Sequence, residues 1–222
     1  MGKKKLNRHD FVFITEEGKS LLRKRLCADC FSVELEMIDE ILSGRADIPG
    51  IIRRVEEKVK EVPIGFVHYQ RIEGNRFRMA AHISEAEIRE IRRPYQVISK
   101  AFLPRNECIA AALNVYNIAR REEIEVGVFG SAALEIITGL PYTDDHSDLD
   151  ILVKPNGKAR LEHFYQKARR SFPDINMDFE VELPNGYGVK LAEIFMNTET
   201  VLGKSIKDVD LLDKKQVLKF LK

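Results

Sequence analysis

Cysteine is scarce in this chain, with only three among 222 residues, at positions 27, 30 and 108. Cys27-Ala-Asp-Cys30 has the spacing of half a zinc site or of a redox pair. No second Cys-x-x-Cys and no His pair completes a zinc site, and no redox setting surrounds the two thiols. We therefore interpret Cys27 and Cys30 as two thiols three residues apart on a helix.

Long apolar runs and a surplus of one charge are also missing. No apolar segment approaches the roughly 20 residues that cross a bilayer. The basic start of the chain leads to Arg8-His9-Asp10 and not to an apolar signal core, so we expect a soluble cytoplasmic protein with no membrane partner. The 36 basic and 35 acidic side chains leave a formal net charge of +1, which argues against a nucleic-acid partner.

The remaining composition is that of an ordinary globular protein, with 44% hydrophobic and 32% charged residues. A chain of this length forms one large domain or two small ones. We expect two, over residues 1–92 and 93–222, because the pattern of elements changes near that point. The fold class predicted is α+β, with a smaller α+β domain before a larger one.

The first part has the pattern of a small α+β unit. The spacing of apolar residues predicts, in order, a strand over 10–14, helix within 17–42, and strands over 51–60, 62–69 and 76–82. Gly74-Asn75 is a hairpin-like turn between the last two strands. The segment Ser84-Glu-Ala-Glu87 has the form of a capping box, which predicts the start of a helix that Pro94 interrupts.

The second part has a different order. The patterns predict a helix over 107–121, a strand over 125–129, a short helix over 132–138, a strand over 149–153, a helix over 158–171, strands over 177–183, 189–195 and 200–206, and a last helix over 214–221. This succession predicts a mixed sheet with flanking helices.

A Gly-Ser turn and a pair of acids carry the chemistry of this second part. Gly130-Ser131 enters a helix, and such a turn offers N–H groups and a positive dipole end to a phosphate. Asp148 and Asp150 lie one residue apart on a strand and so point to the same face. Two carboxylates on one face repel each other unless a cation lies between them, and carboxylate oxygens suit Mg²⁺, with Mn²⁺ as an alternative. These are the parts of a nucleotidyl-transfer site.

A two-metal transfer site commonly uses a third carboxylate from a neighbouring strand. Asp178, Glu180 and Glu182 alternate along the strand 177–183, and we favour Glu180 among the three as a metal ligand. The alternative is that these acids form a solvated strand face. Lys154, directly after the acidic strand, is a candidate phosphate ligand; Lys190 and Lys204 are others, and all three could equally be solvated.

Two histidines lie near charged groups. His9 stands between Arg8 and Asp10, which is either an acid–base cluster or only the opening of a strand. His146 precedes the acidic pair and is either a ligand contact or an ordinary loop residue.

Two neighbouring segments have the sequence Gly-Ser-Ala-Ala-Leu-Glu-Ile-Ile-Thr-Gly-Leu-Pro-Tyr, from Gly130 to Tyr142, and Ser147-Asp-Leu-Asp150. Together they resemble the phosphoribosyl-dephospho-CoA transferases of malonate decarboxylase, also called holo-acyl carrier protein synthases. The Thr-Gly-Leu-Pro-Tyr part distinguishes this family from the wider nucleotidyltransferase superfamily. Weaker similarities lie at Arg8-His-Asp10, Val62-Pro-Ile-Gly65, Arg76 to Ala81, Leu183-Pro-Asn-Gly186 and Val201-Leu-Gly-Lys204. The family tends to have a tryptophan in the helix after Gly-Ser, where this chain has Leu134-Glu135.

The resemblance implies a nucleotidyltransferase-like second domain and a specific reaction. The family moves a phosphoribosyl-dephospho-CoA group from 2′-(5″-triphosphoribosyl)-3′-dephospho-CoA to a serine of the apo acyl carrier protein of malonate decarboxylase, and diphosphate leaves. Carried to this chain, Asp148 and Asp150 are the catalytic and metal-binding acids, with Glu180 as the third ligand. Gly130 and Ser131 hold phosphates, and residues 1–92 are a candidate for docking the carrier or covering the CoA arm.

Two other functions remain open. A generic nucleotidyltransferase would use ATP on a protein or on a small hydroxyl compound. A non-catalytic relative would bind a nucleotide without turnover, with structural acids.

Overall fold

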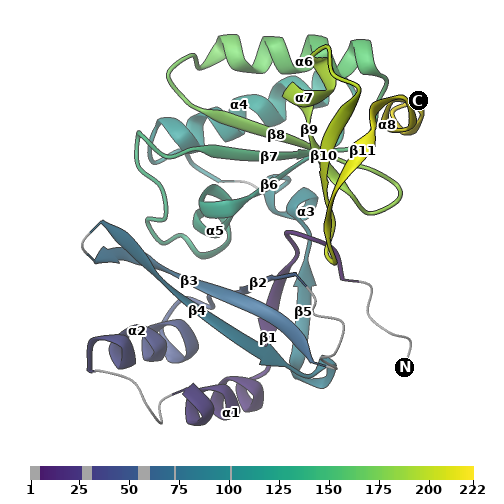
Figure 1. Ribbon diagram of the computed structural model, residues 1–222. Coiled ribbons are helices and arrows are strands. Elements are labelled where there is room, and N and C mark those ends of the chain that lie inside the picture. The colour runs from purple at the N-terminus through teal and green to yellow at the C-terminus, as the bar shows by residue number, and fades with distance from the viewer. Residues whose placement is uncertain (1–5, 27–31, 55–60, 73, 101) are drawn as a thin grey trace.

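The computed structural model describes residues 6–26, 32–54, 61–72, 74–100 and 102–222, which form two sheets stacked through a layer of helices (Figure 1). The first sheet is antiparallel, with strand order β4-β3-β2-β1-β5, and the second is mixed, with order β11-β10-β9-β8-β7-β6. The α+β class is thereby confirmed. Cys27, Cys30 and most of the segment expected as a strand over 51–60 lie outside the described residues.

The first sheet consists of β1 (Phe11–Ile14), β2 (Gly50–Ile52), β3 (Val62–Ile72), β4 (Asn75–Ile83) and β5 (Ile88–Arg92). Helices α1 (Glu16–Leu26) and α2 (Ser32–Ser43) cover its outer face. Side chains alternate along the strands, so Val12 and Ile14 pack against these helices while Phe11 faces the second sheet. The first sheet is therefore buried on both faces along β1.

Two expectations for residues 84–98 are wrong. The Ser84 N–H does donate to Glu87 Oε2 (2.6 Å), as in a capping box, but only the 3₁₀ turn η1 (Glu85–Glu87) follows before β5. Pairing of β5 with β1 buries Ile88 and prevails over the local helix signal. Pro94 begins helix α3 (Pro94–Ile98) and does not interrupt one, because the first helical position needs no N–H.

The second sheet and its helices follow the sequence expectations more closely. In chain order the elements are α4 (Glu107–Arg121), β6 (Val126–Phe129), α5 (Gly130–Thr138), β7 (Leu149–Val153), α6 (Lys158–Ser171), β8 (Met177–Glu182), β9 (Gly188–Lys190), α7 (Leu191–Phe195), β10 (Thr200–Lys204), β11 (Val209–Asp213) and α8 (Lys214–Phe220). The strand expected over 189–195 is wrong beyond Lys190, since Leu191 and Ile194 are buried on one side of a short helix. Strand β11 was not expected.

Helices α3 and α5 lie between the two sheets, and α4 and α6 cover the far face of the second sheet (Figure 1). One apolar core runs through this arrangement, since Phe11 of β1 belongs to the same cluster as Val97 and Ile98 of α3. Tyr142, which is fully buried in the loop after α5, donates its hydroxyl to the carbonyl of Val67 (2.8 Å). Strand β3 is thereby fixed against the second sheet.

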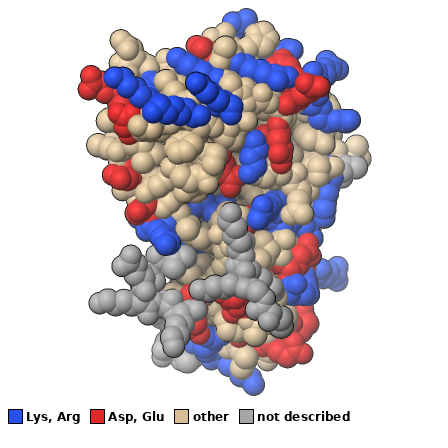
Figure 2. Space-filling model, turned by 90° about the vertical axis from the view of Figure 1, so that its right-hand side faces the viewer, with Lys and Arg blue, Asp and Glu red and all other residues tan. Residues whose placement is uncertain are grey.

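On the face that carries β11 and α8, basic and acidic side chains are interspersed (Figure 2). Among the described residues of this face, no large area has a single charge, in keeping with the balanced composition. Among the described helices, none has both the length and the apolar character required to cross a membrane.

Candidate active site

The turn at Gly130 joins β6 to α5 and lies directly against Asp150. Gly130 has φ +66°, in the left-handed region that favours glycine. A Cβ atom at this position would also collide with Asp150 Oδ2. The backbone angle thus favours glycine, and any larger residue would also displace the Asp150 carboxylate. Ser131 follows at the N-terminal end of the helix.

Asp148 and Asp150 point to the same side of the second sheet, which we call the acid face. The opposite side of β7 carries Leu149, Ile151 and Val153, all fully buried. Asp148 Oδ1 accepts a hydrogen bond from Asn176 Nδ2 (3.0 Å), which orients that carboxylate. Burial, together with the negative charges of the neighbouring Asp178 and Asp148 carboxylates, raises the pKa of Asp150 to about 7. The site therefore favours a cation beside Asp150.

Strand β8 runs parallel to β7 and extends the acid face with three more carboxylates. Asp178 lies in register with Asp150, whereas Glu180 lies beside Leu152. Asp178 forms an ion pair with Lys190 (2.6 Å). Of the β8 acids, Asp178 is thus the nearest along the sheet to the acidic pair.

Glu180 is held by the segment before β1. Arg8 Nη1 donates to Glu180 Oε1 (2.7 Å), and His9 Nε2 lies 3.2 Å from the same oxygen. Burial acts to raise the pKa of Glu180, but the hydrogen bonds and charges of His9 and Arg8 outweigh it and hold that pKa below its usual range. His9 also stacks on Phe129 and has a φ of +65°, which a non-glycine residue rarely adopts. Glu180 therefore joins the two parts of the molecule.

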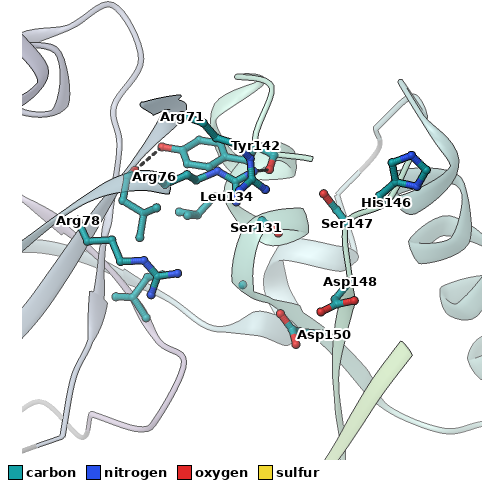
Figure 3. A pocket seen from close by; sticks show the side chains of 13 residues that line it. Arg71, Arg76, Arg78, Ser131, Leu134, Tyr142, His146, Ser147, Asp148 and Asp150 are labelled. Carbon is teal, nitrogen blue, oxygen red and sulfur yellow. Dashed lines mark hydrogen bonds between the residues drawn. The ribbon is translucent and has the colours of Figure 1, made fainter. Parts of the chain in front are cut away.

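A cleft of about 380 Å³ opens between the acid face and the first sheet. Asp148, Asp150, Gly130 and Ser131 line one side of it, together with His146 and Ser147, and the opposite side carries Arg71, Arg76 and Arg78 (Figure 3). The sequence analysis missed these three arginines as site residues. The available signal was their spacing around the Gly74-Asn75 turn, with Arg76 and Arg78 two residues apart on one strand.

The arginines of the cleft are available to an anion. Within the part of the chain that the structure describes, no carboxylate lies at ion-pair distance from Arg71, Arg76 or Arg78. The Arg76 guanidinium donates to the carbonyl of Tyr142, but its Nε is buried and has no hydrogen-bond partner among the described residues. Phosphate oxygens accept hydrogen bonds from such groups in pairs. The cleft thus sets three cations opposite two acids, a charge arrangement that suits a metal–polyphosphate complex.

Residues 96–215 match the family described as phosphoribosyl-dephospho-CoA transferase MdcG C-terminal domain. The match covers more than half of the chain and contains the Gly-Ser turn and both acids of the cleft. The chain belongs to this family. A protein of Bradyrhizobium diazoefficiens named phosphoribosyl-dephospho-CoA transferase is 29% identical over 122 residues, a region that spans 54% of this chain and 54% of that relative, or about half of each. No solved structure matches the chain.

The family match does not include the strands that supply the arginines, since β3 and β4 lie before residue 96. The placement of these arginines in the cleft is therefore supported by the structure and not by the family match.

The lysines considered in the sequence lie apart from this cleft. Lys154 pairs with Glu182 (2.5 Å), which also accepts a hydrogen bond from the Tyr95 hydroxyl (2.9 Å). Lys190 pairs with Asp178, and the Lys204 carbonyl accepts from Arg8 (2.8 Å). Lys154 is not among the residues that line the cleft, so its role as a phosphate ligand stays a prediction without support from this placement.

The acids of the cleft fit a magnesium ion that arrives with a polyphosphate. Among the described residues, no three His, Cys, Asp or Glu side chains already surround a common point. Mg²⁺ is usually held by one or two carboxylates together with substrate phosphates, and so does not need such a cage. The observation that favours a cation here is that burial, and then the charges of Asp178 and Asp148, raise the pKa of Asp150 and so disfavour its unpaired carboxylate. Asp148 and Asp150 would hold it.

Proposed function

We propose that this protein transfers the phosphoribosyl-dephospho-CoA group from 2′-(5″-triphosphoribosyl)-3′-dephospho-CoA to a serine of an apo acyl carrier protein of malonate decarboxylase. The observation that carries the proposal is the cleft in which Arg71, Arg76 and Arg78 face Asp148 and Asp150. Membership of the transferase family supports the same chemistry.

In this reaction the protein chiefly positions charged groups. The N–H-rich turn at Gly130 and Ser131 and the guanidinium groups of Arg76 and Arg78 hold the triphosphate. Asp148 and Asp150 would hold magnesium, which would supply positive charge to offset that of the triphosphate. Glu180, held by Arg8 and His9, was the third carboxylate favoured from the sequence. Asp178, which pairs with Lys190, is the other candidate and lies nearer to the acidic pair, because it is in register with Asp150.

The bonds of the proposed step balance without a further reactant. A bond forms between the serine oxygen of the carrier and the α-phosphorus of the donor. The bond from that phosphorus to the bridging oxygen breaks, so that diphosphate leaves with its electrons. A carboxylate of the acid face takes the proton of the serine hydroxyl. Positioning and electrostatic stabilisation supply most of the rate.

The two halves of the chain have separate tasks in this proposal. Residues 93–222 form the catalytic domain, with a nucleotidyltransferase-like arrangement of sheet and acids. Residues 1–92 form a second domain whose β3–β4 hairpin binds the donor across the cleft. The reaction belongs in the cytoplasm, where CoA derivatives and apo carrier proteins are available.

Intact-mass spectrometry of the apo carrier protein tests the proposal. Incubation with this protein, Mg²⁺ and the triphosphoribosyl donor should add one phosphoribosyl-dephospho-CoA group per carrier. Asp150→Asn should lower the rate by at least about a hundredfold, since loss of a metal ligand removes both binding and charge stabilisation. Asp174→Asn, the same change on an exposed loop, should leave the rate unchanged.

Two results would overturn the assignment. An unmodified carrier together with adenylate transfer from ATP in a parallel tube would indicate a generic nucleotidyltransferase. An Asp150→Asn variant that keeps more than about a tenth of the rate would remove this acid from the metal site.

A further inference from the structure

A second hollow, of about 400 Å³, lies on the first sheet beside the cleft. Three residues, Ile51, Val67 and Arg78, line both the hollow and the cleft. The two spaces therefore adjoin each other. A molecule held by its phosphates in the cleft has room to extend over the strands β2, β3 and β4.

The floor of this hollow is low. Ile51 pairs with Gly65 across β2 and β3, and Gly65 pairs with Ala80 across β3 and β4, so the three residues form one row on the same sheet face. Gly65 has no side chain, Ala80 presents a single exposed methyl group, and Ile51 is half-buried. The result is a low apolar surface, which we call the platform.

Two arginine side chains belong to the lining of the platform. The methylenes of Arg53 lie over Gly65, since a Cβ built on that glycine would be 3.2 Å from Arg53 Cδ. On the other side, Arg78 pairs with Val67 in the next row and extends into the space between the sheet and the acids (Figure 3). A low apolar floor lined by two arginine side chains suits an aromatic base, which stacks on apolar surfaces and on guanidinium planes. A flexible aliphatic chain would gain little from either arginine.

We propose that the platform binds the adenine ring of the nucleotide donor. This inference rests on the proposed function, in which the triphosphate of the same molecule lies in the adjoining cleft. In that donor the adenosine is joined to the triphosphate through one further ribose, so the base must lie close to the phosphates. Anchoring the base on β2, β3 and β4 fixes the distance of the reacting phosphorus from Asp148 and Asp150.

Equilibrium binding to the full chain tests the platform separately from catalysis. The probes are 3′-dephospho-CoA, which has the adenine but no triphosphate, inorganic tripolyphosphate with Mg²⁺, and 4′-phosphopantetheine, which has the arm but no adenine. Ala80→Leu adds a branched side chain to the platform at an exposed strand position. Ala159→Leu makes the same change on the exposed side of α6 and serves as the matched control.

The Ala80→Leu variant should bind 3′-dephospho-CoA about tenfold more weakly and tripolyphosphate as tightly as the unmodified protein. Ala159→Leu should change neither. The inference would be overturned if Ala80→Leu kept its affinity for 3′-dephospho-CoA, or if the unmodified protein did not bind that probe. It would also be overturned if Ala80→Leu weakened the binding of phosphopantetheine as much as that of 3′-dephospho-CoA, since the arm and not the base would then occupy the platform. If Ala80→Leu weakened the binding of 3′-dephospho-CoA but the unmodified protein transferred no group to the carrier, the inference would be supported and the proposed function would be excluded.

Discussion

Gly130 joins β6 to α5 with a backbone angle that favours glycine, and it lies directly against the Asp150 carboxylate. Gly130→Ala should move the Asp150 carboxylate and lower the transfer rate by about a hundredfold, because a displacement of about 1 Å can cost that much. Gly139→Ala is the matched control, since Gly139 has a similar φ of +73° but nothing within 4 Å of an added Cβ. Both variants should lose about 1–2 kcal/mol of stability from the left-handed backbone.

Transfer assays and urea unfolding of the two variants separate these effects. An equal loss of rate in Gly130→Ala and Gly139→Ala would mean that backbone strain, and not contact with Asp150, explains the defect.

Asp10 is a buried carboxyl whose ionisation opposes folding. Burial raises its pKa from 3.8 to about 6, although the Asn7 N–H, which donates to Asp10 Oδ2 (2.9 Å), acts in the other direction. Because the folded pKa lies above the unfolded one, the carboxyl's contribution to stability is complete below about pH 4 and is lost as the pH rises through 6. The loss amounts to about 2–3 kcal/mol at about 1.4 kcal/mol per pH unit.

Asp10→Asn keeps an oxygen acceptor for Asn7 and removes the ionisation. The variant should match the unmodified protein near pH 4 and exceed its free energy of unfolding at pH 7.5. Urea titrations at the two pH values measure this difference, in which the other titrating groups cancel. A difference that does not change with pH would contradict the assignment.

At the scale of elements, the sequence predicted best where one local pattern agreed with tertiary packing. The strand over 149–153 and the helix over 158–171 have the expected bounds, because their apolar periods match the faces that they bury. The capping box at Ser84 made the expected hydrogen bond and still failed to predict a helix, since pairing with β1 is non-local.

The difference between local and non-local contacts also explains which residues of the cleft the sequence predicted and which it did not. Gly130, Ser131, Asp148 and Asp150 are close in sequence, so their approach to one another could be predicted from one strand–helix–strand unit. The arginines of β3 and β4 come from a segment more than fifty residues earlier, and no local pattern places them opposite the acids.

The β3–β4 hairpin can be tested through Arg78, which is exposed and has no ion-pair partner within the described ranges. Arg78→Ala should raise the KM for the donor by about tenfold, since a charge-assisted contact contributes about 1.5–3 kcal/mol. The free energy of unfolding should change by no more than about 0.5 kcal/mol. Steady-state kinetics and urea unfolding provide both numbers.

Arg170→Ala, on the far side of the second sheet, is the control and should leave the KM unchanged. An unchanged KM in Arg78→Ala as well would exclude this arginine from donor binding.

At the scale of the molecule, the two sheets share a core and a buried ion pair, so neither should be stable alone. A fragment of residues 93–222 would lack Arg8 and His9 and leave Glu180, only 8% exposed, without its partners. Removing one side of a buried pair costs about 3–5 kcal/mol, and loss of the buried Phe11 adds a similar amount. These costs approach the whole stability of a typical domain, about 5–15 kcal/mol.

The fragment should therefore lack a cooperative urea transition, as followed by far-UV and near-UV circular dichroism. Glu180→Gln in the fragment should restore part of the stability, because a neutral amide is less costly to leave unpaired than a carboxylate. The same substitution in the full chain should destabilise it, since Arg8 then loses its anion. A fragment with the unfolding midpoint of the full chain would instead establish residues 93–222 as an autonomous domain, and Arg8 and Phe11 as dispensable to its core.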